Sequence, residues 1–156
     1  MKKITVFCAA ALLAGIVTLS ARSENVTDVV KRAAAASQEG RLADAKRDFE
    51  LAQTMDPGNA SIKMNLGFVC QRMGLDGDAA AALEKAAALD NSLAPAHNAL
   101  ALIYESRAMQ SAPGAARFDN LRKAKDHWQG VARFTGDAAM RDMAVRHIAQ
   151  IEEQLK

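Results

Sequence analysis

The side chains that could carry metal or nucleophilic chemistry are few in this sequence of 156 residues, and they lie far apart. The histidines are His97, His127 and His147, and the cysteines are Cys8 and Cys70. Metal sites usually need three or four ligands, often four residues apart on one helix, and none of these residues has that spacing. Cys70 lies among apolar residues, where a thiol is usually a small buried group. We therefore expect no metal site and no cofactor, and we interpret the histidines as structural or surface residues.

Motifs of known catalytic classes are absent as well. The sequence has no glycine-rich phosphate loop, no nucleophile elbow and no motif of paired catalytic carboxylates. Asp126 and His127 are neighbours in sequence, so on a helix their side chains point in different directions. The sequence thus predicts that the protein is not an enzyme, and an enzyme or metal carrier is the least favoured alternative.

The N-terminal residues have the layout of an export signal. Lys2 and Lys3 precede an almost wholly apolar run, residues 4–17, and small residues follow up to Ser23. This order is typical of a secretory signal peptide, which we place at residues 1–21. The alternative is an uncleaved N-terminal anchor, because the apolar run is near the lower limit for spanning a bilayer. We expect an exported protein that is periplasmic or secreted, or one held at the inner membrane if the signal is not cleaved.

The remaining chain carries no net charge. Without Lys2 and Lys3 it has 18 basic and 18 acidic residues. This balance gives no argument for nucleic acid or an anionic membrane as a partner, so membrane contact is expected only through an uncleaved N-terminal segment. One stretch is locally basic, and we interpret it as a solvated helix face. Its basic residues are Arg117, Arg122, Lys123, Lys125 and Arg133.

The composition and its punctuation indicate helices throughout. Ala, Leu, Glu, Lys, Arg and Gln are frequent, long β-branched runs are absent after the N-terminal segment, and Gly or Pro separates segments with helical periodicity. No strand is expected. The predicted helices cover residues 25–38, 42–55, 60–73, 77–89, 94–110, 116–134 and 138–155.

A repeat with a period of about 34 residues organises these helices, a length that accommodates two helices and two tight turns. At this spacing Gly74 repeats Gly40, and Ala79 repeats Ala45. Such a recurrence is the signature of stacked helical hairpins. Residues 60–92 resemble a complete tetratricopeptide repeat (TPR), with signature places taken by Leu66, Gly67, Gly74, Ala79, Leu83 and Ala86.

The resemblance covers nearly all of residues 24–156 and is to small exported bacterial TPR proteins. It implies an all-α fold, a right-handed α-α superhelical solenoid of about three helical hairpins plus a C-terminal capping helix. We place the repeats near 26–59, 60–93 and 94–136, and the capping helix at 138–155. The capping helix has an apolar face that includes Met140, Ile148 and Ile151, as suits the end of a stack.

Two departures from the repeat predict special features. Arg32 stands where Leu66 and Leu100 occur in later copies, so the first helix is expected to be half exposed.

The third repeat is longer than the others, and its extra residues lie between Ser106 and Asn120. We expect longer helices that carry the tip of this hairpin beyond the other repeats, and a floppy loop is the alternative. The projecting hairpin would present Met109, Arg117, Phe118 and Arg122.

The resemblance also implies a binding site. In TPR proteins the first helix of each repeat lines a concave groove that takes an extended peptide or a helix. Some of the residues at these positions could instead belong to the core. The terminal-carboxylate grip of some family members is not expected, because only Asn65 matches it. The groove would present Val30, Ala34, Met64, Asn65, Phe68, Gln71, Arg72, Asn98, Leu102 and Glu105.

These features predict a protein–protein interaction scaffold or adaptor in the bacterial cell envelope. It would bind a peptide or helix of another, unidentified protein in the groove. The alternative is a self-associating structural or assembly subunit of an envelope complex, of the secretion or pilus type. The sequence leaves the oligomeric state open.

Overall fold

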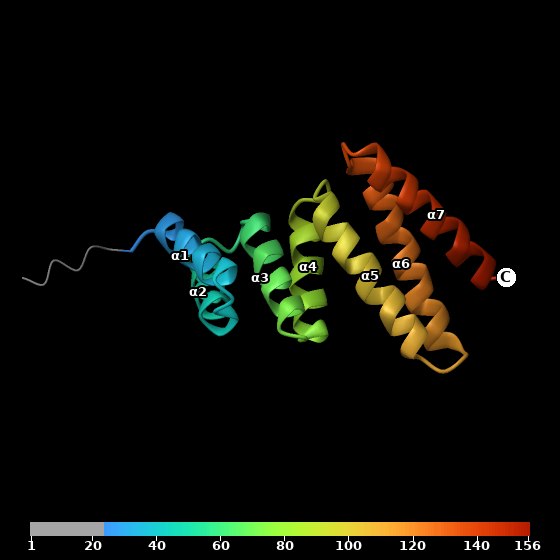
Figure 1. Ribbon diagram of the computed structural model, residues 1–156, viewed down its shortest axis with the longest axis horizontal. Helices are drawn as coiled ribbons and strands as arrows, with labels where there is room; N and C mark the ends of the chain where they lie inside the picture. The colour runs from blue at the N-terminus through green and yellow to red at the C-terminus, as the bar shows by residue number, and fades with distance from the viewer. Residues whose placement is uncertain (1–23) are drawn as a thin grey trace, which may run out of the picture.

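The structure is a computed structural model that describes residues 24–156, and these residues form helices and no strand (Figure 1). The expected signal peptide lies outside the described residues. Every predicted helix is present, and each boundary agrees within one residue, so the all-α fold class is confirmed. None of the described helices is long and apolar enough to cross a membrane. The helices are α1 (Val26–Gln38), α2 (Leu42–Met55), α3 (Ala60–Arg72), α4 (Asp76–Leu89), α5 (Ala94–Gln110), α6 (Ala115–Phe134) and α7 (Ala138–Gln154).

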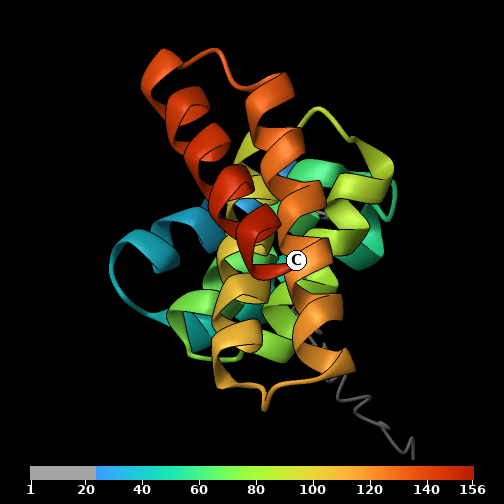
Figure 2. The ribbon, with the colours of Figure 1, turned by 90° about the vertical axis from the view of Figure 1, so that its right-hand side faces the viewer.

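The helices stack in chain order along the long axis of the molecule, and consecutive helices run in opposite directions (Figure 1). The main contacts join sequence neighbours, within the hairpins α1–α2, α3–α4 and α5–α6 and between α6 and α7. Seen along the stack, the successive hairpins are rotated relative to one another (Figure 2). This arrangement is a helical solenoid, in which each hairpin packs against the hairpins next to it in the chain.

The turns of the first two hairpins are built identically. Gly40 and Gly74 adopt φ values of 79° and 73°, in the left-handed region that glycine reaches without steric cost. After each glycine a backbone N–H reaches back across the helix end, from Arg41 to the Ala36 carbonyl and from Leu75 to the Cys70 carbonyl. These are Schellman motifs, and they explain why a glycine recurs at the same place in successive repeats.

Burial follows the repeat phase. Gly67 lies so close to α4 that a Cβ atom there would be 2.6 Å from Leu83 Cγ, and Leu83 is fully buried. In the α5–α6 hairpin, Trp128 takes the place of Leu83 and is also fully buried. Apolar burial at these positions stabilises the stack.

The third hairpin is longer than the second in both of its arms. Helices α5 and α6 have 17 and 20 residues, whereas α3 and α4 have 13 and 14. The α5–α6 turn consequently extends beyond the turns of the other hairpins (Figure 1). The additional residues are therefore mostly helical, and a four-residue turn, residues 111–114, joins the arms.

Helix α7 covers the end of the stack. Ala144 and Ile151 are buried, while Met140, Met143 and Ile148 pack against the core at its margin. The His147 ring stacks on Trp128, with 4.4 Å between ring centroids. Helix α7 therefore shields the α6 face that would otherwise expose the indole.

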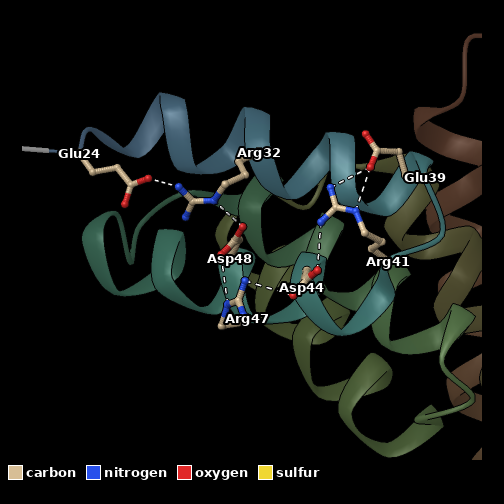
Figure 3. Close-up of polar contacts among 7 residues, drawn as sticks. All are labelled: Glu24, Arg32, Glu39, Arg41, Asp44, Arg47 and Asp48. Atoms are coloured by element: carbon tan, nitrogen blue, oxygen red, sulfur yellow. Dashed lines mark hydrogen bonds and ion pairs between the residues drawn. The ribbon is translucent and has the colours of Figure 1, made fainter.

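The opposite end of the stack uses charge where the interior uses apolar contacts (Figure 3). Arg32 pairs with Glu24 and donates from Nε to Asp48 Oδ2 over 2.6 Å, and the Asp48 side chain is only 5% exposed. The hydrogen bond from Arg32 holds the pKa of Asp48 below its usual value. One repeat later, Leu66 and Ala82 occupy these two places and are buried. The Arg32 side chain is 45% exposed, which agrees with a half-exposed terminal helix.

Candidate binding groove

Three adjoining hollows follow one face of the stack, from α1 across α3 and α5 to the start of α7. The first has a volume of about 200 Å³ and includes Val30 and Asn65. The second, of about 270 Å³, includes Asn65 and Phe68. The third is the largest, at about 590 Å³, and also includes Phe68. Neighbouring hollows share a lining residue, so they adjoin one another, and we call this row of three hollows the groove.

The largest hollow is mainly apolar, with amide groups at intervals. Phe68 from α3, Leu102 from α5 and Met140 from α7 contribute its apolar surface, and Gln71 and Asn98 contribute amides. The Oδ1 atom of Asn98 is buried and has no hydrogen-bond partner among the described residues. An unpaired buried acceptor is unfavourable, so Asn98 carries a polar atom that the contacts of the fold leave unsatisfied.

The charged side chains along the groove are already engaged within the protein. Arg72 donates to both the carbonyl and the hydroxyl of Ser37, each over 2.8 Å. Asp137 caps α7 by accepting from the backbone N–H groups of Ala139 and Met140. The groove therefore offers apolar surface and amides more than free charge.

Eight of the ten residues that the sequence predicted for a groove line these hollows. Met64 lines none of the three hollows and packs against the core. Glu105 accepts hydrogen bonds from Trp128 Nε1 over 3.0 Å and His147 Nδ1 over 2.9 Å, so it supports the packing of α7. The eight are Val30, Ala34, Asn65, Phe68, Gln71, Arg72, Asn98 and Leu102.

The sequence interpretation missed the part of the groove that the α6–α7 connection supplies. Phe134, Thr135, Gly136 and Asp137 line the largest hollow together with Met140. The repeat contained a signal for Met140. Met140 lies 45 residues after Pro95, which lines the same hollow, and Trp128 lies 45 residues after Leu83. The capping helix therefore also completes the groove.

Two of the histidines form a pair between α5 and α6. His97 Nε2 lies 2.9 Å from the Asn91 carbonyl, which can only accept, so this nitrogen carries a proton. His97 Nδ1 then accepts from His127 Nδ1 over 3.1 Å. Burial lowers the pKa of His127 to about 4, and the repulsion between two protonated rings would act in the same direction. A Cβ atom at Gly130 would be 2.6 Å from His97 Nδ1, so glycine is needed beside this pair.

The His, Cys, Asp and Glu side chains of residues 24–156 do not gather in groups that suit a metal ion. No group of three His, Cys, Asp or Glu side chains in this range could hold a metal ion. Cys70 is 1% exposed, and burial raises the pKa of its thiol, which disfavours the reactive thiolate.

The residues predicted for the projecting hairpin lie outside the groove. Met109 is 78% exposed and Phe118 is 39% exposed. Arg117 donates to the Gln154 side chain over 3.3 Å, and Arg122 pairs with Asp119 over 3.2 Å. The groove and the hairpin tip are thus two separate surfaces.

Comparison with known proteins gives similarity in structure alone. No protein-family model and no curated protein matches the sequence. The first TPR of Spaghetti bound to an HSP90 peptide is 15% identical, with a TM-score of 0.65 over 83% of this chain and 92% of that chain. The TPR domain of P58(IPK) is 21% identical, with a TM-score of 0.68 over 83% of this chain and 33% of that chain.

A bacterial protein shows the same similarity. The type III secretion chaperone SycD of Yersinia enterocolitica, in complex with a peptide of the translocator YopD, is 14% identical. Its TM-score is 0.64, over 84% of this chain and 95% of that chain. At these identities the similarity concerns the fold.

Proposed function

We propose that this chain, which has the tetratricopeptide-repeat fold, is a non-enzymatic adaptor that binds a segment of another protein in its groove. The observation that carries this proposal is the row of three adjoining hollows from α1 to α7. Together they present apolar side chains beside amide groups, the combination that suits recognition of a protein segment. Phe68 lies at the junction of two hollows and is the central apolar anchor.

Two structurally similar proteins support this proposal. The first TPR of Spaghetti is bound to an HSP90 peptide, and SycD is in complex with a peptide of YopD. Both are similar to this chain over more than four-fifths of its length. We infer that this chain also takes a peptide segment from a protein partner.

The groove favours an uncharged segment over a charged chain terminus. Arg72 is the basic side chain that lines it, and its guanidinium already donates to Ser37. A bound carboxylate would have to displace that contact. Amide side chains can instead pair with the backbone N–H and carbonyl groups of an extended segment.

The cell envelope is the proposed location, and the support for it is the N-terminal sequence. Basic, apolar and small residues follow one another in the order typical of a secretory signal. The partner would then be another protein of the envelope, periplasmic or at the membrane.

A self-associating subunit is the second candidate, and the distribution of charge favours it. Residues 24–93 carry 8 basic and 11 acidic residues, whereas residues 94–156 carry 9 basic and 7 acidic residues. Opposite charge at the two ends would favour head-to-tail association of copies. Light scattering on the purified protein separates a monomeric adaptor from an oligomer.

Site-specific cross-linking tests the groove directly. A photoreactive residue placed at Leu102 would report on the groove, and one at Val145 on the outer face of α7. Both native side chains are large, apolar and well exposed, at 43% and 55%, so the two positions are matched. We expect a cross-linked partner from position 102 and none from 145. Cross-links to a second copy would favour self-association, and equal labelling from both positions would contradict a groove partner.

A further inference from the structure

We propose that the tip of the α5–α6 hairpin, residues 106–123, contacts an anionic lipid surface. This tip lies apart from the groove, so the proposal does not depend on a partner segment being bound there. It extends beyond the other hairpin turns (Figure 1), which allows it to reach a surface that they would not touch.

The tip exposes apolar side chains that the fold does not use. Met109, in the last turn of α5, is 78% exposed, and Phe118, in the first turns of α6, is 39% exposed. Neither belongs to the hydrophobic core or lines the groove. Such side chains can enter the boundary between headgroups and acyl chains, where each gains from leaving water.

The same tip concentrates positive charge, although the chain after Lys3 is balanced. Its charged residues are four basic and one acidic, a net charge of +3. Arg107 donates to the Asp76 carbonyl and Arg117 to Gln154, both uncharged acceptors. Only Arg122 pairs with a carboxylate, that of Asp119, in a pair that is 67% exposed on both sides. Arg117 and Arg122 are therefore weakly compensated and available to an anion, whereas Arg107 and Lys123 lie over the Tyr104 ring.

The α3–α4 turn shows that this charge is specific to the longer hairpin. The first turn of α4 carries Asp76 and Asp78, whereas the first turn of α6 has no acidic residue and includes Arg117. Basic charge beside exposed apolar residues is the pattern of surfaces that bind anionic membranes. A projecting tip also suits a planar interface better than a partner that must enclose it.

Hydrogen exchange on the full-length chain tests this proposal locally. Exchange would be measured alone, with phosphatidylcholine vesicles, and with vesicles that include phosphatidylglycerol. The apolar N-terminal run can bind vesicles by itself, so the informative readout is the exchange rate of the amides around residues 111–118. We expect slower exchange there only with the anionic vesicles, and recovery in about 0.5 M salt, where charge is screened.

Variants identify the contributing side chains. In vesicle titrations followed by this protection, Arg117→Gln and Arg122→Gln should each weaken binding about fivefold, and Phe118→Ser about tenfold or more. Arg146→Gln and Val145→Ser, on the exposed face of α7, are the matched controls and should change nothing. Unchanged tip exchange with anionic vesicles, or equal protection by neutral ones, would overturn the proposal. So would equal protection by polyglutamate without vesicles, which would indicate an acidic protein partner.

Discussion

The α3–α4 and α5–α6 hairpins fill the same repeat positions in different ways. In the shorter hairpin, Gly67 of the first helix allows the Leu83 side chain of the second to approach. In the longer hairpin, Trp128 takes the place of Leu83, and the closest approach is reversed, since Gly130 of the second helix accommodates His97 of the first. The comparison indicates that the repeat fixes which positions are buried. The contact that brings the helices together can change with hairpin length.

Removing the two equivalent core residues should have the largest effect. We expect Leu83→Ala to lower the free energy of unfolding by about 2–5 kcal/mol and Trp128→Ala by about 3–5 kcal/mol, because each leaves a cavity. Removal of the indole also deletes its stack on His147 and its hydrogen bond to Glu105. Denaturant titration measures both costs. A cost below about 0.5 kcal/mol for either residue is typical of exposed sites and would contradict the repeat phase.

The reversed approach can be tested with a single methyl group. Gly130→Ala should cost about 1–3 kcal/mol, because the new Cβ atom overlaps the His97 ring. Combining it with His97→Ala should cost less than the sum of the two single changes, since the overlap is then removed. Additive costs in such a double-mutant cycle would show that the new methyl group does not clash with the His97 ring.

His127 in the third hairpin and Asp48 in the first should each make the free energy of unfolding depend on pH, in different pH ranges. The pKa of His127 is about 4 in the folded protein, against its usual value of about 6.5 in an unfolded chain. As the pH falls below about 6.5, the unfolded chain therefore binds more protons than the folded protein. Stability should therefore fall as the pH drops from about 6.5 towards 4. The lowered pKa of Asp48 contributes stability above about pH 4, and this is lost at lower pH.

Denaturant midpoints across pH 3–8 distinguish the two groups. His127→Phe, which keeps an aromatic ring beside Tyr104, should remove the slope between pH 6.5 and 4 and leave the loss below pH 4. Asp48→Asn should reduce the loss below pH 4 instead. A slope between pH 6.5 and 4 that persists in the histidine variant would assign it to other groups.

The smallest effect on stability is expected at the hairpin tip. Met109→Ser should change the free energy of unfolding by less than about 0.5 kcal/mol, because the side chain is 78% exposed. Thermal or denaturant unfolding measures this difference. A larger loss would mean that the tip supports the fold, and would weaken the case that its apolar residues serve contact with another surface.

Most of the fold could be predicted because it is local. Glycines such as Gly40 and Gly74 mark the turns, and the repeat period assigns the helices that pack together. The pairing of Arg32 with Asp48 could not be predicted in this way, since it joins residues that occupy apolar positions in other copies. The His97–His127 pair was also missed, because it depends on how the longer hairpin crosses at Gly130.

The groove was predicted in part, and the reasons differ along its length. Residues such as Phe68 and Leu102 follow from the repeat phase, which places one helix face along the groove. Glu105 has the same phase, but the length of α5 brings it under α7, where it binds Trp128 and His147. Phe134, at the end of α6, and Met140, in α7, flank the connection to the capping helix, whose position depends on packing beyond the regular repeat.

The central claim is that the groove holds a partner segment through Phe68. Its most direct test compares Phe68→Ala with Val145→Ala, for capture of the partner that cross-links at Leu102. Both variants should keep a cooperative thermal transition. Phe68→Ala should weaken capture about tenfold or more, as expected for loss of a buried aromatic anchor, and Val145→Ala should not. Unchanged capture by a folded Phe68→Ala protein would contradict the account.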